Sequence, residues 1–445
     1  MRPIRILSLA LLLSPLPLPA QSSTLLKAAH LLDPRTGTTL SPAAILIRDD
    51  KILQVAPPSQ ITAPPQTKII DLGQATLLPG LIDAHTHLLL NIVIPPEAEA
   101  QRHSNPEFAP GLLLAIVESP TKRTLMGALL AREDLDSGIT TVRNLGHSGI
   151  DGDTELRDAI NAGRVPGPRI LASGRKLIAE GDYIQNLNPA LSKAILDQEF
   201  LLIKSPDQAA QAVRENALQN VDVIKVTEDE NISVPELSAI VQEAHREHLK
   251  VAVHAADTVS IQIAIDAGAD SIEHGNRATD DQLKQMRDKG IFFDLTPTFY
   301  DSLFLKITEP SIVISPAQRT SYAGTDAGRQ RYDQLVQRVL KSGVKFAAGS
   351  DMCWFYPGKT RGQASIATFI NLQRAGMPTL DILRAITSNA AELLGWSDRI
   401  GTLEPGKFAD IIATPGDPIA DITQIQQIPF VMKSGQVIRS ILTSH

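Results

Sequence analysis

Two histidines separated by one residue stand at the end of the stretch Leu77-Leu-Pro-Gly-Leu-Ile-Asp-Ala-His85-Thr-His87. The apolar run that surrounds the Pro-Gly pair predicts a buried strand, and residues i and i+2 of a strand point to the same face. His85 and His87 are therefore expected to point together. Neutral imidazole is the commonest nitrogen ligand of zinc-like ions, so the pair is a candidate part of a metal site. A chance His-x-His is the alternative, and further ligands have to decide between the two.

Four other polar residues stand within or at the end of apolar runs that predict strands. Lys225 lies inside such a run, His254 and His274 each end one, and Asp351 closes the sequence Phe346-Ala-Ala-Gly-Ser-Asp351. Each has an ordinary explanation, because a strand-end histidine is often a hydrogen-bonded structural residue and Gly-Ser-Asp is often a turn. Their recurrence on several strands favours one site assembled from strand ends.

The elements that must position these residues alternate between strand and helix. Two helix starts are marked by capping-box spacing, Ser233 with Glu236 and Thr279 with Gln282. The repeated rhythm predicts an α/β fold with a parallel sheet, and eight strands are the number of a TIM (β/α)8 barrel. The eight predicted strands span residues 81–87, 139–145, 169–174, 221–227, 250–255, 271–274, 291–295 and 344–351.

The segments on either side of the predicted barrel have a different character. Residues 24–70 hold short alternating apolar runs broken by proline pairs, and the C-terminal tail returns to short strands and turns. We therefore expect both ends to form one small composite β-sandwich domain. Two long connections, 88–119 and 175–208, are expected to cover the carboxyl ends of the barrel strands. The predicted divisions are a signal peptide at 1–20, the N-terminal part of the β-sandwich at 21–78, the barrel at 79–398 and the C-terminal part of the β-sandwich at 399–445.

The first twenty residues have the order of a secretory signal peptide. Arg2 and Arg5 give a basic start, residues 6–13 are apolar, and residues 15–20 lead to a polar segment at Gln21. A Sec-type signal of this kind predicts a secreted or periplasmic protein with no membrane span in its mature form.

Composition limits the partners of the chain. Its 445 residues carry a net charge of -7 and no block of Lys or Arg, which argues against nucleic acid and anionic membranes as partners. A small-molecule substrate is the better expectation. Cys353 is the single cysteine, so no intramolecular disulfide can form. The sequence leaves the role of Cys353 and the oligomeric state open, a homo-oligomer included.

Four motifs together give the chain a family resemblance. It resembles the amidohydrolase superfamily, close to the imidazolonepropionase-like branch that includes the prolidase-like Xaa-Pro dipeptidases. The resemblance implies two divalent ions, with zinc expected, one held by His85 and His87 with Asp351 and the other by His254 and His274. It also implies that Lys225 bridges the ions after its amine has taken up carbon dioxide. The motifs are Pro79-Gly-Leu-Ile-Asp-Ala-His-Thr-His87, Ile272-Glu-His-Gly275, Ala348-Gly-Ser-Asp351 and Leu403-Glu-Pro-Gly-Lys-Phe-Ala-Asp410.

Physical chemistry supports this implied arrangement. An ammonium buried beside two dications is pushed toward the neutral amine, and a neutral amine reacts with carbon dioxide to form an anionic carbamate. That anion offsets the charge of the two ions, which lower the pKa of a bridging water to generate the hydroxide nucleophile. Asp351 would accept a proton from the water and pass it to the leaving amine, which makes it the candidate catalytic residue.

Three further residues are candidates for substrate binding. His103 and His147 follow the first and second predicted strands and would polarise a substrate carbonyl, although each is also explained as an ordinary loop residue. Arg175 follows the third strand and is a candidate to hold a substrate carboxylate. The resembled dipeptidases often carry Tyr two residues after the bridging lysine, where this chain has Thr227 followed by an acidic run at 228–230.

The expected function is that of an exported binuclear amidohydrolase, which cleaves an amide bond of a dipeptide such as Xaa-Pro or of an N-acyl amino acid. Hydrolysis of cyclic amides or lactones is the alternative reaction, and a non-catalytic metal-dependent binding protein is the alternative class. A mononuclear deaminase is disfavoured because Asp257, a predicted helix N-cap, stands where its proton-shuttling Glu would be. Imidazolonepropionase itself conflicts with Lys225 and with the signal peptide.

Overall fold

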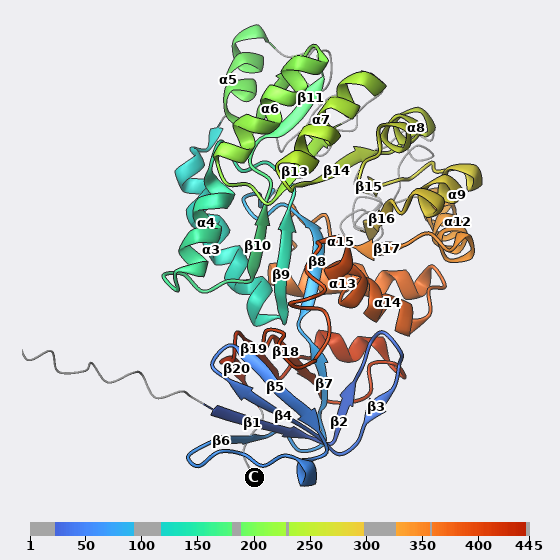
Figure 1. The fold of residues 1–445 in the computed structure, drawn as a ribbon. Helices are drawn as coiled ribbons and strands as arrows, with labels where there is room; N and C mark the ends of the chain where they lie inside the picture. Colours follow the sequence, from blue (N-terminus) through green and yellow to red (C-terminus); the bar gives the residue numbers. More distant parts are fainter. Residues whose placement is uncertain are drawn as a thin grey trace, which may run out of the picture.

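The structure is a computed structural model, and it describes residues 23–92, 117–179, 188–227, 231–297, 326–356 and 358–441, apart from the side chains of 326 and 327. The predicted signal peptide at 1–20, the candidate His103 and the acidic run at 228–230 lie outside these residues. The described chain folds into an α/β part and a smaller part built of β strands (Figure 1).

Parallel strands form the centre of the α/β part, as the sequence predicts. They are arranged in a three-stranded sheet of order β10-β9-β8 and a seven-stranded sheet of order β12-β11-β13-β14-β15-β16-β17, and neighbouring strands in both sheets are parallel. Each of the eight predicted strands contains one of these elements. Their bounds are β8 (Leu81–Thr86), β9 (Ile139–Asn144), β10 (Arg169–Ala172), β11 (Lys176–Ala179), β12 (Phe200–Ile203), β13 (Val223–Thr227), β14 (Lys250–Ala255), β15 (Ser271–His274), β16 (Phe292–Leu295) and β17 (Phe346–Ala348).

The segment 175–208 differs from the plain connection that we predicted, because it contains strands β11 and β12. Strand β11 follows β10 after a bend at residues 173–175 and pairs with β13 instead of β9. The buried carboxylate of Asp153 supports this bend by accepting hydrogen bonds from the backbone N–H groups of Ser173 and Gly174, at 3.0 and 3.2 Å. Strand β12 then adds to the outer edge of β11.

The two parallel sheets meet where β8 lies beside the segment that follows β17. The backbone N–H of Asp351 donates to the carbonyl of His85 over 2.7 Å, and the N–H of His87 donates to the carbonyl of Met352 over 3.2 Å. The buried carboxylate of Asp83 adds side-chain contacts, because it accepts from the backbone N–H and the hydroxyl of Ser350 over 2.8 and 2.6 Å. These bonds fix the predicted histidine strand against the predicted Asp351.

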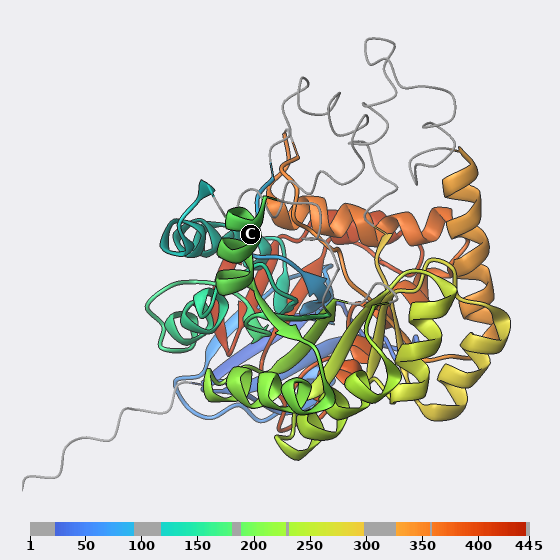
Figure 2. The ribbon, with the colours of Figure 1, turned by 90° about the horizontal axis from the view of Figure 1, so that it is seen from above.

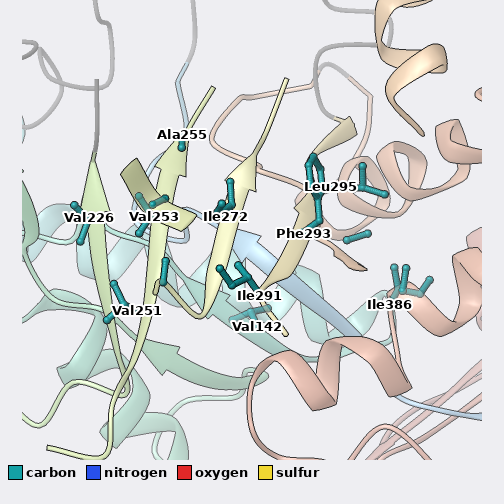
Figure 3. Close-up of a cluster of buried hydrophobic side chains, with 14 of the residues drawn as sticks. Val142, Val226, Val251, Val253, Ala255, Ile272, Ile291, Phe293, Leu295 and Ile386 are labelled. Carbon is teal, nitrogen blue, oxygen red and sulfur yellow. The ribbon is translucent and has the colours of Figure 1, made fainter. Parts of the chain in front are cut away.

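Helices surround the strands on the outside (Figures 1 and 2). Both predicted capping boxes are present, at the starts of α7 and α9, and Asp257 is the N-cap of α8. The main core lies between strands and helices, where Val226, Val253, Ile272 and Phe293 are fully buried (Figure 3). The helices are α3 (Pro120–Asp136), α4 (Gly152–Asn161), α5 (Pro189–Glu199), α6 (Pro206–Leu218), α7 (Val234–Arg246), α8 (Thr258–Ala267), α9 (Asp280–Lys289), α12 (Asp326–Ser342), α13 (Arg361–Arg374), α14 (Thr379–Ala385) and α15 (Ser388–Leu393). Within the described ranges, the helices are all too short or too polar to cross a membrane.

The smaller part combines strands from both ends of the chain. A six-stranded sheet of order β20-β19-β18-β7-β2-β3 places C-terminal β18 antiparallel to N-terminal β7, and a four-stranded sheet has the order β5-β4-β1-β6. Buried residues of both sheets, such as Leu26, Ile45, Leu77 and Phe430, belong to one apolar cluster. The strands are β1 (Ser23–Ala28), β2 (His30–Leu32), β3 (Thr39–Leu40), β4 (Ala43–Arg48), β5 (Lys51–Ala56), β6 (Lys68–Asp71), β7 (Thr76–Pro79), β18 (Ile411–Thr414), β19 (Phe430–Lys433) and β20 (Gln436–Ser440), with 3-10 helices η1 (Pro58–Gln60) and η3 (Ile422–Gln426).

Replacement of Gly349 by Ala is predicted to destabilise the junction between β8 and β17. A Cβ atom at this position would lie 2.2 Å from the Cβ and 2.5 Å from the backbone N of His85, so the histidine strand has to move. We expect Gly349→Ala to lower the free energy of unfolding in urea by about 1–3 kcal/mol. Gly416→Ala is the matched control, because its Cβ would meet only the flexible end of Gln424 at 3.0 Å, and its loss should stay within about 0.5 kcal/mol. Equal stability of both variants would contradict the tight contact at Gly349.

Candidate metal centre

His85, His87 and Asp351 converge at the junction between β8 and the segment that follows β17. The Nε2 atoms of His85 and His87 lie 3.5 and 3.2 Å from the same Asp351 oxygen, Oδ1. His85 of β8 and His87, which directly follows this strand, therefore point together, in agreement with their spacing in the sequence. The three side chains can offer ligand atoms that lie within 4.8 Å of one another, which is the size of a site for one ion.

The other predicted ligands lie beside this group. The ring centroids of His254 and His274 are 4.4 Å apart, and the ring of His274 is 4.9 Å from that of His85. Lys225 stands on β13, next to the strand that carries His254, and its charge contributes to lowering the pKa values of His85, His254 and His274. Six residues from five strands and their ends thus lie in one cluster.

Burial keeps the four histidines in the form that binds metals. Removal from water lowers the pKa of His85 to about 3 and that of His274 to about 4, and it also lowers the pKa values of His87 and His254. The rings are therefore neutral at pH 7 and have a free lone pair for an ion. At Asp351 burial acts in the opposite direction, but the hydrogen bond to His87 and the nearby histidine rings hold the pKa of the carboxyl below its usual value.

Lys225 is the unusual member of the cluster. Its side chain is buried, and its Nζ atom forms no hydrogen bond with the part of the chain that the structure describes. Burial lowers the pKa of Lys225 to about 8, so a substantial fraction of the amine is neutral in mildly alkaline solution. A buried nitrogen without a partner is unfavourable unless another group completes the site. Neutral imidazoles, one carboxylate and a reactive amine form a donor set that fits divalent metal ions.

Three residues at this site have the left-handed backbone conformation, with positive φ angles. His274 and Asp351 have φ angles of 69° and 50°, and His147, which precedes helix α4, has a φ of 59°. Residues other than glycine rarely adopt positive φ, and such strain concentrates at functional sites. Strict alternation along β15 would direct His274 away from the face of its neighbour Glu273. The left-handed conformation of His274 interrupts that alternation at the strand end.

A buried polar layer that we did not predict supports His85. Glu273 accepts a hydrogen bond from His85 Nδ1 over 2.8 Å, and Arg143 donates to both oxygens of Glu273 over 3.0 and 2.9 Å. Arg143 also contacts Asp294 at 3.3 Å. Because Nδ1 is used in this way, the Nε2 atom of His85 is left for an ion, as is usual for metal-binding histidines. Charged residues inside the apolar strands β9, β15 and β16 were the available signal, and it is the same signal that identified Lys225.

Charges in this layer balance without a metal ion. Burial disfavours ionisation of Glu273, but the charge of Arg143 and the hydrogen bond from His85 lower its pKa well below the usual value. Burial and the neighbouring Glu273 raise the pKa of Asp294 well above its usual value, which keeps this carboxyl protonated. His85, Glu273 and Asp294 also lie within ligand distance of one another. The Arg143 guanidinium that contacts both carboxyl groups makes them a support for His85 and a poor second metal site.

The candidate substrate-binding residues have different positions. The ring centroid of His147 lies 5.2 Å from that of His87, beside the cluster. Arg175 forms an ion pair with Glu215 of helix α6, so its guanidinium is directed to the outer helix and is not brought to the histidines. The neighbouring Lys176 contacts His147 instead, with Nζ 2.8 Å from Nε2. The bend after β10 therefore places the lysine, and not the arginine for which we predicted substrate binding, beside the cluster.

The chain is similar to several known proteins. A model of the amidohydrolase family matches residues 76–438. An ochratoxinase of Aspergillus niger is 28% identical over 451 residues, covering 92% of this chain and 86% of that protein. An imidazolonepropionase of Deinococcus deserti is 28% identical over 394 residues, covering 85% and 87%. The crystal structure of a Xaa-Pro dipeptidase with bound methionine in the active site is similar with a TM-score of 0.76 and 26% identity, covering 94% of this chain and 100% of that one.

Replacement of Glu273 by Gln is predicted to weaken metal binding. Glutamine lacks the charge that orients His85 Nδ1 and that balances Arg143, so the affinity for divalent ions should fall by about 10- to 100-fold. Competition with a chelator measures this affinity, and circular dichroism checks that the fold is kept. Glu215→Gln is the control, because it removes a carboxylate that pairs with Arg175 on the outer helix, and its metal affinity should equal the wild type. A folded Glu273→Gln protein with unchanged affinity would refute the supporting role.

Proposed function

The chain belongs to the amidohydrolase family, in its imidazolonepropionase- and prolidase-like branch, and is a hydrolase that acts on carbon–nitrogen bonds; from this premise we propose that it cleaves an amide bond of a small substrate at a binuclear metal centre. The substrate is a dipeptide such as Xaa-Pro or an N-acyl amino acid. The proposed ligands are His85, His87, Lys225, His254, His274 and Asp351, and zinc is the proposed metal.

The observation that carries the binuclear proposal is the buried Nζ of Lys225, which has no hydrogen-bond partner among the described residues. A site for one ion needs no amine at this position. A neutral amine that adds to carbon dioxide and loses a proton becomes a carbamate, whose two oxygens are suited to bridging two dications. The low pKa of Lys225 makes the required neutral amine available.

Each residue of the site has a specific task in this proposal. When bound, the ions supply activation of a water molecule and polarisation of the amide carbonyl. Asp351 is held ionised by His87, so its carboxylate accepts a proton from the water and returns it to the departing nitrogen. Its side chain keeps 15% of its surface exposed, compared with 1% for His85, which suits a group that has to reach the substrate. Glu273 keeps His85 in the tautomer that presents Nε2.

The Xaa-Pro dipeptidase structure supports the substrate class, because a dipeptidase cleaves an amide bond of a small peptide. The structural match extends over all of that dipeptidase chain and over most of this chain. The adjacent Lys176 and His147 provide polar groups beside the metal ligands, as expected for a substrate that is itself polar.

Our proposal includes the architecture and location that the sequence predicts. We interpret β8, β9, β10 with β11, and β13 to β17 as one (β/α)8 barrel over residues 79–398, with β12 as an additional strand. The hydrogen bonds between β8 and the segment after β17 support closure of the barrel between its first and last strands. The hydrogen bond from Asp222 N–H, directly before β13, to Ala172 O of β10 supports closure between the two parallel sheets on the other side. The two β sheets are interpreted as a composite sandwich of residues 21–78 and 399–445. Residues 1–20 are proposed to direct export.

The proposed function predicts both the number of bound metal ions and the substrates that are hydrolysed. Protein loaded with zinc should contain two ions per chain and should cleave members of a panel of Xaa-Pro dipeptides and N-acyl amino acids, measured by release of the free amino acid. His85→Ala should lower both metal content and rate. His245→Ala is the control, because this half-exposed histidine pairs with Asp270 outside the cluster, and neither quantity should change. One ion at full activity, or turnover of lactones with none of the amides, would contradict the proposal.

Removal of the Lys225 amine is predicted to abolish most activity. We expect Lys225→Ala to lose at least about 100-fold in kcat, and short-chain carboxylates to restore part of it by occupying the bridging position. Reactivation of metal-free wild-type protein by zinc and bicarbonate should become faster as the pH rises through about 8, because the fraction of neutral amine increases there. Lys193→Ala, which removes an exposed lysine of helix α5, should behave as wild type. Wild-type turnover in Lys225→Ala would exclude the bridge.

A further inference from the structure

A lysine and a histidine that are not metal ligands in our proposal lie together beside the metal cluster. Lys176, the first residue of β11, is 5% exposed, and its Nζ is 2.8 Å from His147 Nε2. The His147 ring is 5.2 Å from the ring of His87. The Nδ1 atom of His147 is buried, and it has no hydrogen-bond partner among the described residues. A cation and an unused imidazole nitrogen thus adjoin the reaction site.

The surroundings of Lys176 are shaped to hold its long side chain. Gly146 has a φ of 101°, and a Cβ atom there would lie 2.5 Å from Cγ and 2.6 Å from Cδ of Lys176. Only glycine therefore fits beside the lysine stem. On strand β12 the ring of Phe200 lies 4.9 Å from the ammonium nitrogen, a distance at which a cation interacts favourably with an aromatic face.

His147 is held in place by a second buried interaction. Arg123 of helix α3 donates to the carbonyl oxygen of His147 over 3.0 Å and pairs with Glu199 of helix α5 over 2.5 Å. Glu199 also accepts from the backbone N–H of Gly149 over 3.3 Å. The side chains of Arg123 and Glu199 are fully buried, so this interaction fixes a loop whose His147 has the unusual φ of 59°. The contact between Lys176 and His147 is therefore prearranged in the fold.

Arg175 and Lys176 are adjacent in sequence, but their side chains contact different parts of the molecule. The arginine pairs with Glu215 on the outer helix α6, whereas the lysine contacts the loop that carries His147. The charge of Lys176 also acts on the metal cluster, because it adds to the effect of burial in lowering the pKa values of His87 and His147. Lys176 is thus a basic residue whose charge acts on the reaction site, whereas Arg175 is paired with the outer helix.

We infer that Lys176 and His147 form the subsite that binds the carboxylate of the leaving amino acid. This inference rests on the proposed amide hydrolysis and names its substrate class, which is N-acyl amino acids and dipeptides with a free C-terminal carboxylate. An ammonium has three N–H donors and binds carboxylates as a point charge, and one donor directed to His147 orients it. A charge-assisted hydrogen bond at this buried position discriminates an acid from the corresponding neutral amide.

Kinetics on matched substrate pairs test the subsite. Alanyl-proline and N-acetyl-phenylalanine are compared with their C-terminal amides, using the zinc-loaded protein. Lys176→Met should raise KM for the two acids by roughly 10- to 100-fold, with KM for the amides changed by less than about threefold. Its kcat and metal content should match the wild type. Lys176→Gln provides a second variant, and Lys193→Met on helix α5 is the control for loss of a lysine charge.

Calorimetry tests binding without turnover. Zinc-loaded wild-type protein should bind proline more tightly than prolinamide, and Lys176→Met should lose affinity for proline by the same 10- to 100-fold as in the kinetics. Equal effects on acids and amides, unchanged proline affinity in both Lys176 variants, or a selective effect in Arg175→Met instead would overturn the inference. If no amide is hydrolysed, the proposed function fails, and the proline affinities of wild type and Lys176→Met still decide the subsite.

Discussion

The contact between Asp83 and Ser350 is the interaction on which the rest of the site depends. Asp83 lies two residues before His85, and Ser350 directly precedes Asp351, so one buried carboxylate joins the strand of the first two candidate ligands to the segment of the last. Burial raises the pKa of Asp83 to about 6 against the effect of its hydrogen bonds with Ser350 and His85. Burial of the Asp83 carboxylate is therefore unfavourable in itself, but its hydrogen bonds to Ser350 fix the position of Asp351 relative to His85.

Beside this junction, buried ion pairs support three of the segments that carry residues of the site. Arg143 with Glu273 orients His85, and Arg123 with Glu199 holds the backbone of His147. A third pair, Arg361 with Asp134, reaches the hydroxyl of Thr86 and the carbonyl of Met352 between the ligands. Isolated buried pairs contribute little net stability, so their arrangement around the candidate site is better explained by the positional accuracy that catalysis needs.

The sequence was sufficient to predict the strands and to single out the six residues of the cluster as candidate metal ligands, because apolar runs mark buried parallel strands and a polar residue at their ends is conspicuous. It was insufficient for β11 and β12, since a bend at residues 173–175 ends β10, which pairs with β9, and begins a separate strand β11, which pairs with β13. The same bend sends the side chains of Arg175 and Lys176 to different surroundings, and alternation along a strand cannot be followed through such a break. Glu273 and Arg143 carry the same signal as Lys225, a charged residue within an apolar strand, but our prediction did not include them. The left-handed backbone of His274 has no signal in the residue type.

The pairing of β18 with β7 has a consequence for the order in which the molecule is completed. Strand β7 leads through Gly80 directly into the histidine strand, yet its partner Thr414 is 338 residues beyond Thr76 in the chain. Because synthesis runs from the N-terminus to the C-terminus, the edge of β7 that pairs with β18 has no partner until nearly the whole chain has been made. Contacts of such long range are slow to form. The base of the histidine strand is therefore among the last regions to become ordered, and a truncated chain that lacks β18 leaves one edge of β7 open.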